Sequence, residues 1–423
     1  MAAPQFTTEV ECARVIEAPA DIVWEIAGDF GSAWHPAMAA CQAGAVDGAV
    51  ERVFTVHGVE RTFRERQTFR DDGGRQLRYR MVEGSTVLDR YDAAIRVDGH
   101  GRGARIVWSA VLTGRVADAV RAGADETREI FEQGLDFIES RLTVAPCTLE
   151  APRRLGLLCA GEGELVLFLH GIGGRKENWR HQLQAVAGTA RAVALDLRGY
   201  GESAPAPQPL GLEDHFADIS AVMAHFGARR LHLVGMSYGS WIAASFAHAH
   251  PELVASLTLS GGCTGMSEAA PEPVSASRQP RLAPLERGLS PADMAGDVVS
   301  SLKGPDCPQE AEDELLASMR AIPAATYRAA IECFTAPPFR LRFERWKMPV
   351  LMMTGECDRL ASPAEIGSGA RRIFEARAGE KAPAEVELAV IPRAGHLCNL
   401  EAAGTYNGHL RTFIARHRKD TGN

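Results

Sequence analysis

The five residues Gly235-Met-Ser-Tyr-Gly239 have the composition and spacing of a site for a nucleophile. The apolar stretch 231–234 before them is typical of a buried strand, and the stretch 240–247 after them has a helical pattern. A sharp turn between such a strand and helix lifts a serine hydroxyl out of the sheet. The pattern therefore predicts Ser237 as a nucleophile, and the alternative is a chance Gly-x-Ser-x-Gly in an ordinary turn.

A serine hydroxyl is a weak nucleophile near neutral pH, so it needs a base and a group that orients the base. His396 stands just after the apolar stretch 386–391, and Asp358 stands just after the apolar stretch 350–354. These positions predict His396 as the base and Asp358 as the orienting acid. Glu356 is the rival for the second role.

Residues His170-Gly-Ile-Gly-Gly174 follow directly after the apolar stretch 165–169. Acyl transfer forms an oxyanion that needs two preorganised N–H donors. We expect the backbone amides of Ile172 and Tyr238 to form this oxyanion hole, and His170 to have a structural role. No phosphate-binding or dinucleotide-binding glycine pattern follows, and the nine cysteines include no Cys-x-x-Cys pair. The sequence predicts neither a cofactor nor a metal.

The second half of the chain alternates short apolar segments with helical patterns. Such segments are typical of a parallel sheet that helices cover on both faces. The expected strands are 165–169, 192–197, 231–236, 254–259, 350–354 and 386–391. Residues 264–345 break this rhythm with a proline-rich loop and helical patterns around 291–303 and 309–334, which predicts a helical cap inserted between two strands.

Three aromatic residues are candidates for the substrate pocket, judged from their positions beside the oxyanion loop and in the cap. They are Trp179, Tyr327 and Phe334. The alternative for each is that it packs the core or fastens the cap. Arg175 and Lys176 follow the oxyanion loop and are candidates for attracting an anionic substrate, although cations on loops are more often solvated.

The first part of the chain has a different pattern of predicted strands and helices. A strand-like segment 6–17 and a short helix are followed by strand-like segments 50–57, 59–69, 76–82, 90–97 and 105–112, and then by one long amphipathic helix from about 116 to 142. This order predicts an α+β domain over residues 1–145, in which an antiparallel sheet curves around the helix and leaves a cavity. Residues 146–423 would form the second domain.

Length and charge exclude several classes of protein. The 423 residues are too many for one ordinary domain of roughly 100–200 residues. The 46 basic and 54 acidic residues give a net charge of −8, which argues against a nucleic-acid partner. No apolar run approaches the roughly 20 residues of a membrane span, and the N-terminus lacks the pattern of a signal peptide. We expect a cytoplasmic protein without a membrane or nucleic-acid partner, and the sequence leaves its oligomeric state open.

The first domain resembles the START-like superfamily, also called SRPBCC or polyketide cyclase/dehydrase. The segments that carry this resemblance are Ala18-Pro-Ala-Asp-Ile-Val-Trp, Asp29-Phe-Gly-Ser-Ala-Trp-His-Pro, Tyr79-Arg-Met-Val-Glu-Gly and Ile106-Val-Trp-Ser. The resemblance implies a helix-grip fold with a cavity for an apolar small molecule. It does not imply any one reaction.

The second domain resembles the α/β-hydrolase superfamily. Besides the loops already described, Leu195-Asp-Leu-Arg-Gly-Tyr-Gly-Glu-Ser, Gly355-Glu-Cys-Asp and Ala394-Gly-His-Leu-Cys-Asn-Leu-Glu carry this resemblance. Within the superfamily the chain is most similar to the branch of 3-oxoadipate enol-lactonases, small esterases and cofactor-free haloperoxidases. Because the expected nucleophile is serine, the dehalogenases and epoxide hydrolases that use aspartate are disfavoured. The chain has Tyr-Gly-Ser after this serine, where enol-lactonases more often have Met-Gly-Gly.

Together these features predict a serine hydrolase that cleaves a carboxylic ester or lactone of a small, largely apolar molecule through an acyl-enzyme. A carbon–carbon bond hydrolase, a thioesterase and a cofactor-free perhydrolase would use the same three residues and stay open. A different class of function would lie in the first domain, as a ligand-binding module or a cyclase.

Overall fold

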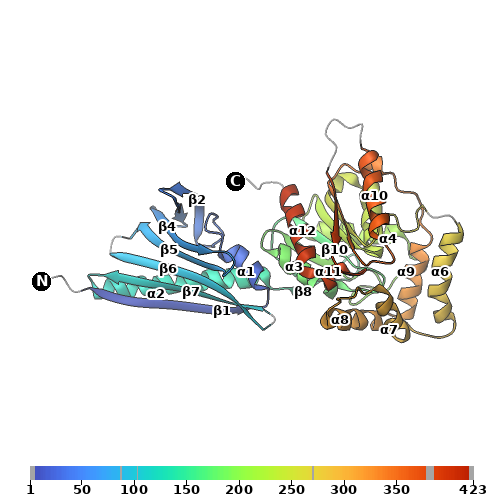
Figure 1. Ribbon diagram of the computed structural model, residues 1–423, viewed down its shortest axis with the longest axis horizontal. Coiled ribbons are helices and arrows are strands. Elements are labelled where there is room, and N and C mark those ends of the chain that lie inside the picture. The colour runs from blue at the N-terminus through green and yellow to red at the C-terminus, as the bar shows by residue number, and fades with distance from the viewer. Residues whose placement is uncertain (1–4, 86–87, 102, 269–270, 378–384, 419–423) are drawn as a thin grey trace. The chain divides into compact units, whose positions relative to one another are not determined.

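The computed structural model describes residues 5–85, 88–101, 103–268, 271–377 and 385–418. The chain folds into two compact units, Met1–Thr143 and Val144–Asn423, which are described separately below (Figure 1). Among the helices of the described residues, none combines the length and the apolar character that a membrane crossing needs.

The N-terminal unit is one antiparallel sheet of seven strands with two helices. The strands have the order β1-β7-β6-β5-β4-β3-β2. The short helix α1 (Ala20–Ala27) follows β1, and the long helix α2 (Ala117–Leu142) lies along one face of the sheet (Figure 1). The strand bounds are β1 Phe6–Ile16, β2 Met38–Val46, β3 Ala49–Val56, β4 Thr62–Asp71, β5 Gln76–Glu83, β6 Arg90–His100 and β7 Gly103–Gly114.

Alternation of side chains builds the core of this unit. Along β7, the residues Ile106, Trp108, Ala110 and Leu112 are buried, and they face the buried stripe of α2. The Trp108 ring stacks on Phe131 of α2, with the ring centroids 4.3 Å apart. Burial of such large aromatic and aliphatic surfaces holds the helix against the sheet.

The C-terminal unit contains an eight-stranded sheet in the order β15-β14-β13-β12-β10-β11-β9-β8. The strands from β15 to β11 in this order are parallel, and β9 and β8 are antiparallel additions at one edge. The bounds are β8 Ala145–Leu149, β9 Leu155–Ala160, β10 Leu165–Leu169, β11 Arg191–Leu195, β12 Leu231–Met236, β13 Val254–Ser260, β14 Val350–Gly355 and β15 Val386–Ile391.

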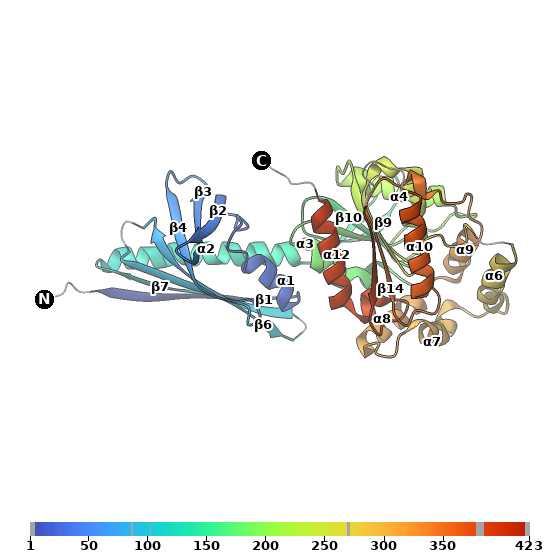
Figure 2. The ribbon, with the colours of Figure 1, turned by 45° about the horizontal axis from the view of Figure 1, so that its top comes forward.

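Helices cover both faces of this sheet. Figure 2 shows α3 (Arg180–Ala187) and α12 (Ala403–His417) on one side, and α4 (Leu212–His225) and α10 (Pro363–Glu375) on the other. Helix α5 (Tyr238–Ala249) follows β12, and its residues 238–248 are all buried. The short helix α11 (Cys398–Glu401) precedes α12.

Four helices between β13 and β14 form the cap. They are α6 (Pro271–Glu286), α7 (Pro291–Leu302), α8 (Gln309–Arg320) and α9 (Ala324–Phe334). Ser290 caps α7 by accepting a hydrogen bond from the N–H of Asp293, and Pro291 occupies the first turn, where its missing N–H costs nothing.

Several elements differ from the sequence-based expectations. Strand β2 was not expected, because its residues are mostly small and exposed and show no apolar alternation. Strands β8 and β9 were not expected either. The proline-rich segment expected as a loop contains the helix α6, with Pro280 and Pro284 inside it. The helical pattern 309–334 is divided into α8 and α9 at Pro323.

Candidate active site

Ser237 occupies a strained turn between β12 and α5. Its backbone has φ 54° and ψ −113°, a conformation that costs an L-residue energy and recurs at functional sites. The neighbouring backbone comes so close that a Cβ on Gly235 would lie 2.4 Å from the carbonyl oxygen of Gly239. The N–H of Ser237 donates to the carbonyl of Ser260 on β13 over 2.7 Å. Sheet and helix together therefore fix the direction of the Ser237 side chain.

His396 and Asp358 meet across 38 residues of sequence. Nδ1 of His396, in the loop after β15, lies 2.9 Å from Oδ2 of Asp358, in the loop after β14. Both side chains are buried. The other ring nitrogen of His396, Nε2, is buried without a hydrogen-bond partner among the described residues. His396 and Ser237 line the same cavity of about 210 Å³.

Asp358 is held as a carboxylate. Burial opposes its charge, but the hydrogen bond and the electrostatic interaction with His396, together with the backbone N–H groups of Ala361 and Leu360, bring the pKa of Asp358 below its usual value. The N–H groups of Leu360 and Ala361 donate to Oδ1 over 2.8 and 3.0 Å. The rival acid Glu356 is exposed and accepts the N–H of Arg393, away from His396.

The loop after β10 brings Ile172 to the same cavity as Ser237. His170 shapes this loop, because its Nδ1 lies 2.8 Å from the Gly171 carbonyl and its Nε2 accepts the N–H of Leu197 over 3.0 Å. Burial lowers the pKa of His170, which keeps the ring neutral, as this pair of hydrogen bonds requires. His170 thus positions the loop and does not serve as a second base.

The side chain of Tyr238 packs in the core, so only its backbone N–H is available to the site. Its N–H is the first of helix α5, directly after Ser237. Its hydroxyl lies 2.9 Å from Nε2 of His215, and its ring stacks on Trp241, both in the core. The amides of Tyr238 and Ile172 therefore belong to the two segments that flank the Ser237 hydroxyl, where an oxyanion would form.

The candidate pocket residues are placed differently. Tyr327 on α9 lines the cavity, as does Met319 on α8. Trp179 is fully buried in the core and packs on Phe168 and Tyr406 instead. Phe334 packs edge-on against Tyr238 and Trp241, which fastens the end of α9 to α5, and it is not among the described lining residues.

The two cations after the oxyanion loop do not serve the cavity. Lys176 is buried and pairs with Asp196 at 2.6 Å and with Glu202 at 2.9 Å. Arg175 lies 3.4 Å from Glu177. The expectation of a solvated cation is therefore wrong for buried Lys176, and neither side chain is among the described residues that line the cavity of Ser237. Sequence reasoning missed other lining residues, namely Arg281 on α6 and Val298, Val299, Ser301 and Leu302 on α7.

The N-terminal unit has its own cavity, of about 190 Å³, between the sheet and α2. Aromatic side chains in its wall are Phe54, Phe63, Tyr79, Tyr91, Trp108 and Phe131, and aliphatic and polar side chains complete the lining. A buried ion pair also lines it, because Arg52 on β3 lies 2.6 Å from Glu65 on β4. Glu65 raises the pKa of Arg52 against the opposing effect of burial. The pair makes a polar but electrically balanced patch, and Arg61 and Glu126 add two further charged side chains to the wall.

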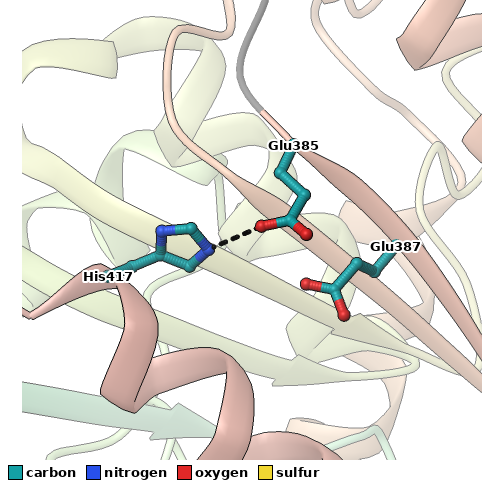
Figure 3. A group of neighbouring side chains, drawn as sticks. All are labelled: Glu385, Glu387 and His417. Carbon is teal, nitrogen blue, oxygen red and sulfur yellow. Dashed lines mark ion pairs between the residues drawn. The ribbon is translucent and has the colours of Figure 1, made fainter.

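One cluster in the C-terminal unit has the residue types of a metal site. Figure 3 shows His417 at the end of α12 beside Glu385 and Glu387 near the start of β15. Nε2 of His417 lies 3.2 Å from Glu385, and the guanidinium of Arg416 pairs with both glutamates. Because Arg416 already compensates their charge, we assign no metal to this cluster.

Comparison with known proteins agrees with this division of the chain. The model of the alpha/beta hydrolase fold family matches residues 164–403, and the chain belongs to this family. The model of the family described as polyketide cyclase / dehydrase and lipid transport matches residues 7–143, which are the N-terminal unit.

Similar proteins include enzymes of several activities. The dihydrolipoyllysine-residue acetyltransferase component of the acetoin cleaving system of Pseudomonas putida is 29% identical over 61% of this chain and 65% of its own length. Epoxide hydrolase B of Mycobacterium tuberculosis is 36% identical over 22% of this chain and 26% of its own length. The chain thus spans less than two thirds of these relatives.

Solved structures share the fold of the C-terminal unit. A thermophilic esterase from Thermogutta terrifontis has a TM-score of 0.53 at 23% identity, over 65% of this chain and 100% of that one. An enol-lactonase from Burkholderia xenovorans has a TM-score of 0.50 at 21% identity, over 62% of this chain and 96% of that one.

Proposed function

We propose that the chain is a serine hydrolase that cleaves a carboxylic ester or lactone of a small molecule, with Ser237, His396 and Asp358 as the catalytic residues. The observation that carries the proposal is the buried, unpartnered Nε2 of His396, which lines one cavity with Ser237 while Nδ1 is held by Asp358. A base in this state has one nitrogen left for the proton of the serine hydroxyl.

The reaction would proceed in two halves. Ser237 Oγ attacks the ester carbonyl and gives its proton to Nε2 of His396, and the amides of Ile172 and Tyr238 hold the oxyanion. The ester C–O bond breaks as His396 returns the proton to the leaving oxygen, which leaves an acyl-enzyme. Water then attacks the acyl-enzyme through the same base and releases the acid.

Epoxide hydrolases are among the relatives, but a serine nucleophile favours acyl substrates. Attack of Ser237 Oγ on an epoxide carbon would form an ether, and an ether has no carbonyl through which water can release the product. An ester of Ser237 has such a carbonyl. This chemistry supports esters, lactones and thioesters over epoxides for this chain.

A labelling experiment tests the proposal. The full chain should react covalently with a fluorophosphonate probe and hydrolyse members of a panel of aryl esters, lactones and thioesters. Ser237→Ala should lose both the label and at least about 10³-fold in kcat, with an unchanged melting temperature that shows an intact fold. Turnover of the whole panel by Ser237→Ala at the wild-type rate would refute the assignment, and labelling of wild type without hydrolysis of any panel member would contradict the proposed reaction class.

The N-terminal cavity supports a second, non-catalytic function, which is binding of a small apolar molecule. Its aromatic walls fit a ring compound, and the Arg52–Glu65 pair offers hydrogen bonds to an oxygen substituent. Gly123 on α2 lines this cavity, so Gly123→Leu should fill it. We expect 1-naphthol to quench the fluorescence of wild type but not of Gly123→Leu, while ester hydrolysis is equal in both. Equal quenching in both would contradict the proposal.

A further inference from the structure

Arg281 is the one lysine or arginine among the described residues that line the cavity of Ser237 and His396. It comes from α6, the cap helix that the sequence pattern did not indicate. The other lining side chains of the cap are mostly apolar, from Val298, Val299 and Leu302 on α7 to Leu315 and Met319 on α8 and Ile331 on α9. Arg281 is half-buried, and a positive charge beside these apolar side chains favours an anionic ligand.

The structure describes no carboxylate in that role. Nη1 of Arg281 donates to the carbonyl of Ser277, at 2.7 Å, and to the hydroxyl of the same residue. Among the described residues, the hydrogen bonds of Arg281 are those of Nη1 alone, and no acidic side chain forms an ion pair with it. Arg278, one turn earlier on the same helix, differs, because it pairs with Glu332 at 3.6 Å. The cation that faces the cavity is thus the one left without an acid.

The charge of Arg281 acts on Tyr327, a residue that lines the cavity. Burial raises the pKa of the Tyr327 hydroxyl, and the positive charge of Arg281 opposes that rise. Arg281 and Tyr327 line the cavity together with Ser237. A guanidinium with two free donors and a nearby hydroxyl is a suitable receptor for a carboxylate, which a guanidinium binds through two parallel hydrogen bonds.

We propose that Arg281 binds a free carboxylate of the substrate, so that the natural substrate is an ester or lactone carrying a second, ionised acid group. The proposal rests on the proposed hydrolysis at Ser237. Water cleaves the acyl C–O bond, and the products are a dicarboxylate and an alcohol, or one hydroxy-dicarboxylate from a lactone. No electrons are transferred.

Paired substrates of equal carbon number test this role. Wild type should hydrolyse monoethyl glutarate with a higher kcat/KM than uncharged ethyl pentanoate. Arg281→Gln should lose about 10- to 100-fold in kcat/KM on monoethyl glutarate, the range expected for a charge-assisted hydrogen bond, and should change little on ethyl pentanoate. Arg278→Gln is the matched control, on the same helix but paired with Glu332, and should behave as wild type.

A binding measurement separates this proposal from the proposed catalysis. With Ser237→Ala in the full chain, calorimetry at pH 7 should show tighter binding of monoethyl glutarate than of uncharged ethyl pentanoate, and Arg281→Gln in that background should abolish the difference. If this binding is observed but wild type hydrolyses no ester, the proposed hydrolase is refuted and the proposed carboxylate site is still supported. If monoethyl glutarate binds no more tightly than ethyl pentanoate, or if Arg281→Gln lowers kcat/KM for both esters equally, the role of Arg281 is overturned.

Discussion

Nδ1 of His396 lies 2.9 Å from Oδ2 of Asp358, while Nε2 of the same ring is buried beside the cavity without a described partner. A carboxylate can only accept, so this contact places the proton on Nδ1 and leaves Nε2 free to accept one. The carboxylate therefore sets the tautomer on which the proposed base depends.

Asp358→Asn should disable the site without unfolding it. An amide can donate to Nδ1 and stabilise the wrong tautomer, so kcat on an ester should fall by about 10³- to 10⁴-fold. Glu356→Gln is the matched control, because Glu356 is the neighbouring acid and lies on the surface. Near-wild-type turnover by Asp358→Asn, or an equal loss in Glu356→Gln, would show that Asp358 does not orient the base.

The backbone of Gly261 packs closely against the ring of His396. It has φ 62°, and a Cβ there would lie 2.9 Å from Cε1 of His396. Gly261→Ala should therefore displace the imidazole and lower kcat by tenfold or more, in addition to the roughly 1–2 kcal/mol that a left-handed alanine costs.

Gly227→Ala is a control that separates the backbone cost of Gly261→Ala from its steric effect on His396. Gly227 has almost the same φ, 64°, but nothing lies within 4 Å of its added Cβ. Chemical unfolding should show a similar backbone cost in both variants, whereas kcat should fall only in Gly261→Ala. An equal kcat in the two variants would mean that His396 tolerates the intrusion.

His215 makes stability depend on pH. Burial, with the nearby charge of Arg198, lowers the pKa of His215 to about 3 from an ordinary value of 6.5. As pH falls below 6.5 the unfolded chain takes up a proton that the folded chain refuses, so stability is lost between about pH 6.5 and 3. Between pH 7 and 5 this one group should cost about 2 kcal/mol.

His215→Gln tests this dependence. Glutamine can still hydrogen-bond the Tyr238 hydroxyl, which lies 2.9 Å from Nε2 of His215, but it cannot be protonated in this range. The urea-unfolding free energy of wild type should fall more steeply than that of the variant as pH drops from 7 to 5. Buried His170 and His232 also have lowered pKa values, so only the difference between the two proteins reports on His215. Parallel slopes would contradict the assignment.

Sequence patterns pointed to Ser237, Asp358 and His396 because Ser237 directly follows an apolar strand and the other two lie in the loops just after apolar strands. Parallel strands end at the same edge of a sheet, so a local signal was enough to predict that the three would meet. Their contacts, including the 2.9 Å approach of His396 to Asp358, follow from that edge. The loop that we propose for the oxyanion hole was predicted in the same way, from its position after β10.

The cap residues had no such local signal. Arg281 reaches the cavity only because α6 folds over the sheet, and two prolines within α6 concealed the helix. Trp179 was expected in the pocket because it is close in sequence to the oxyanion loop, yet burial against Phe168 and Tyr406 takes its ring into the core. Strand β2 likewise forms only because β3 offers it a partner, since its own residues have weak strand preference.

Removal of one partner of the Arg52–Glu65 pair in the N-terminal cavity should lower stability strongly, whereas replacement of both partners by apolar residues should lower it little. Both side chains are about 95% buried, and the guanidinium also lies 4.3 Å from the ring centroid of Phe30. Arg52→Met leaves the carboxylate of Glu65 buried alone and should cost about 3–5 kcal/mol in the unfolding of this unit. The double variant Arg52→Met/Glu65→Met removes both charges and should recover most of that loss, because apolar side chains suit the aromatic surroundings. Equal instability of the single and double variants would show instead that the lost packing of Arg52 on Phe30, and not the stranded charge, dominates the energy.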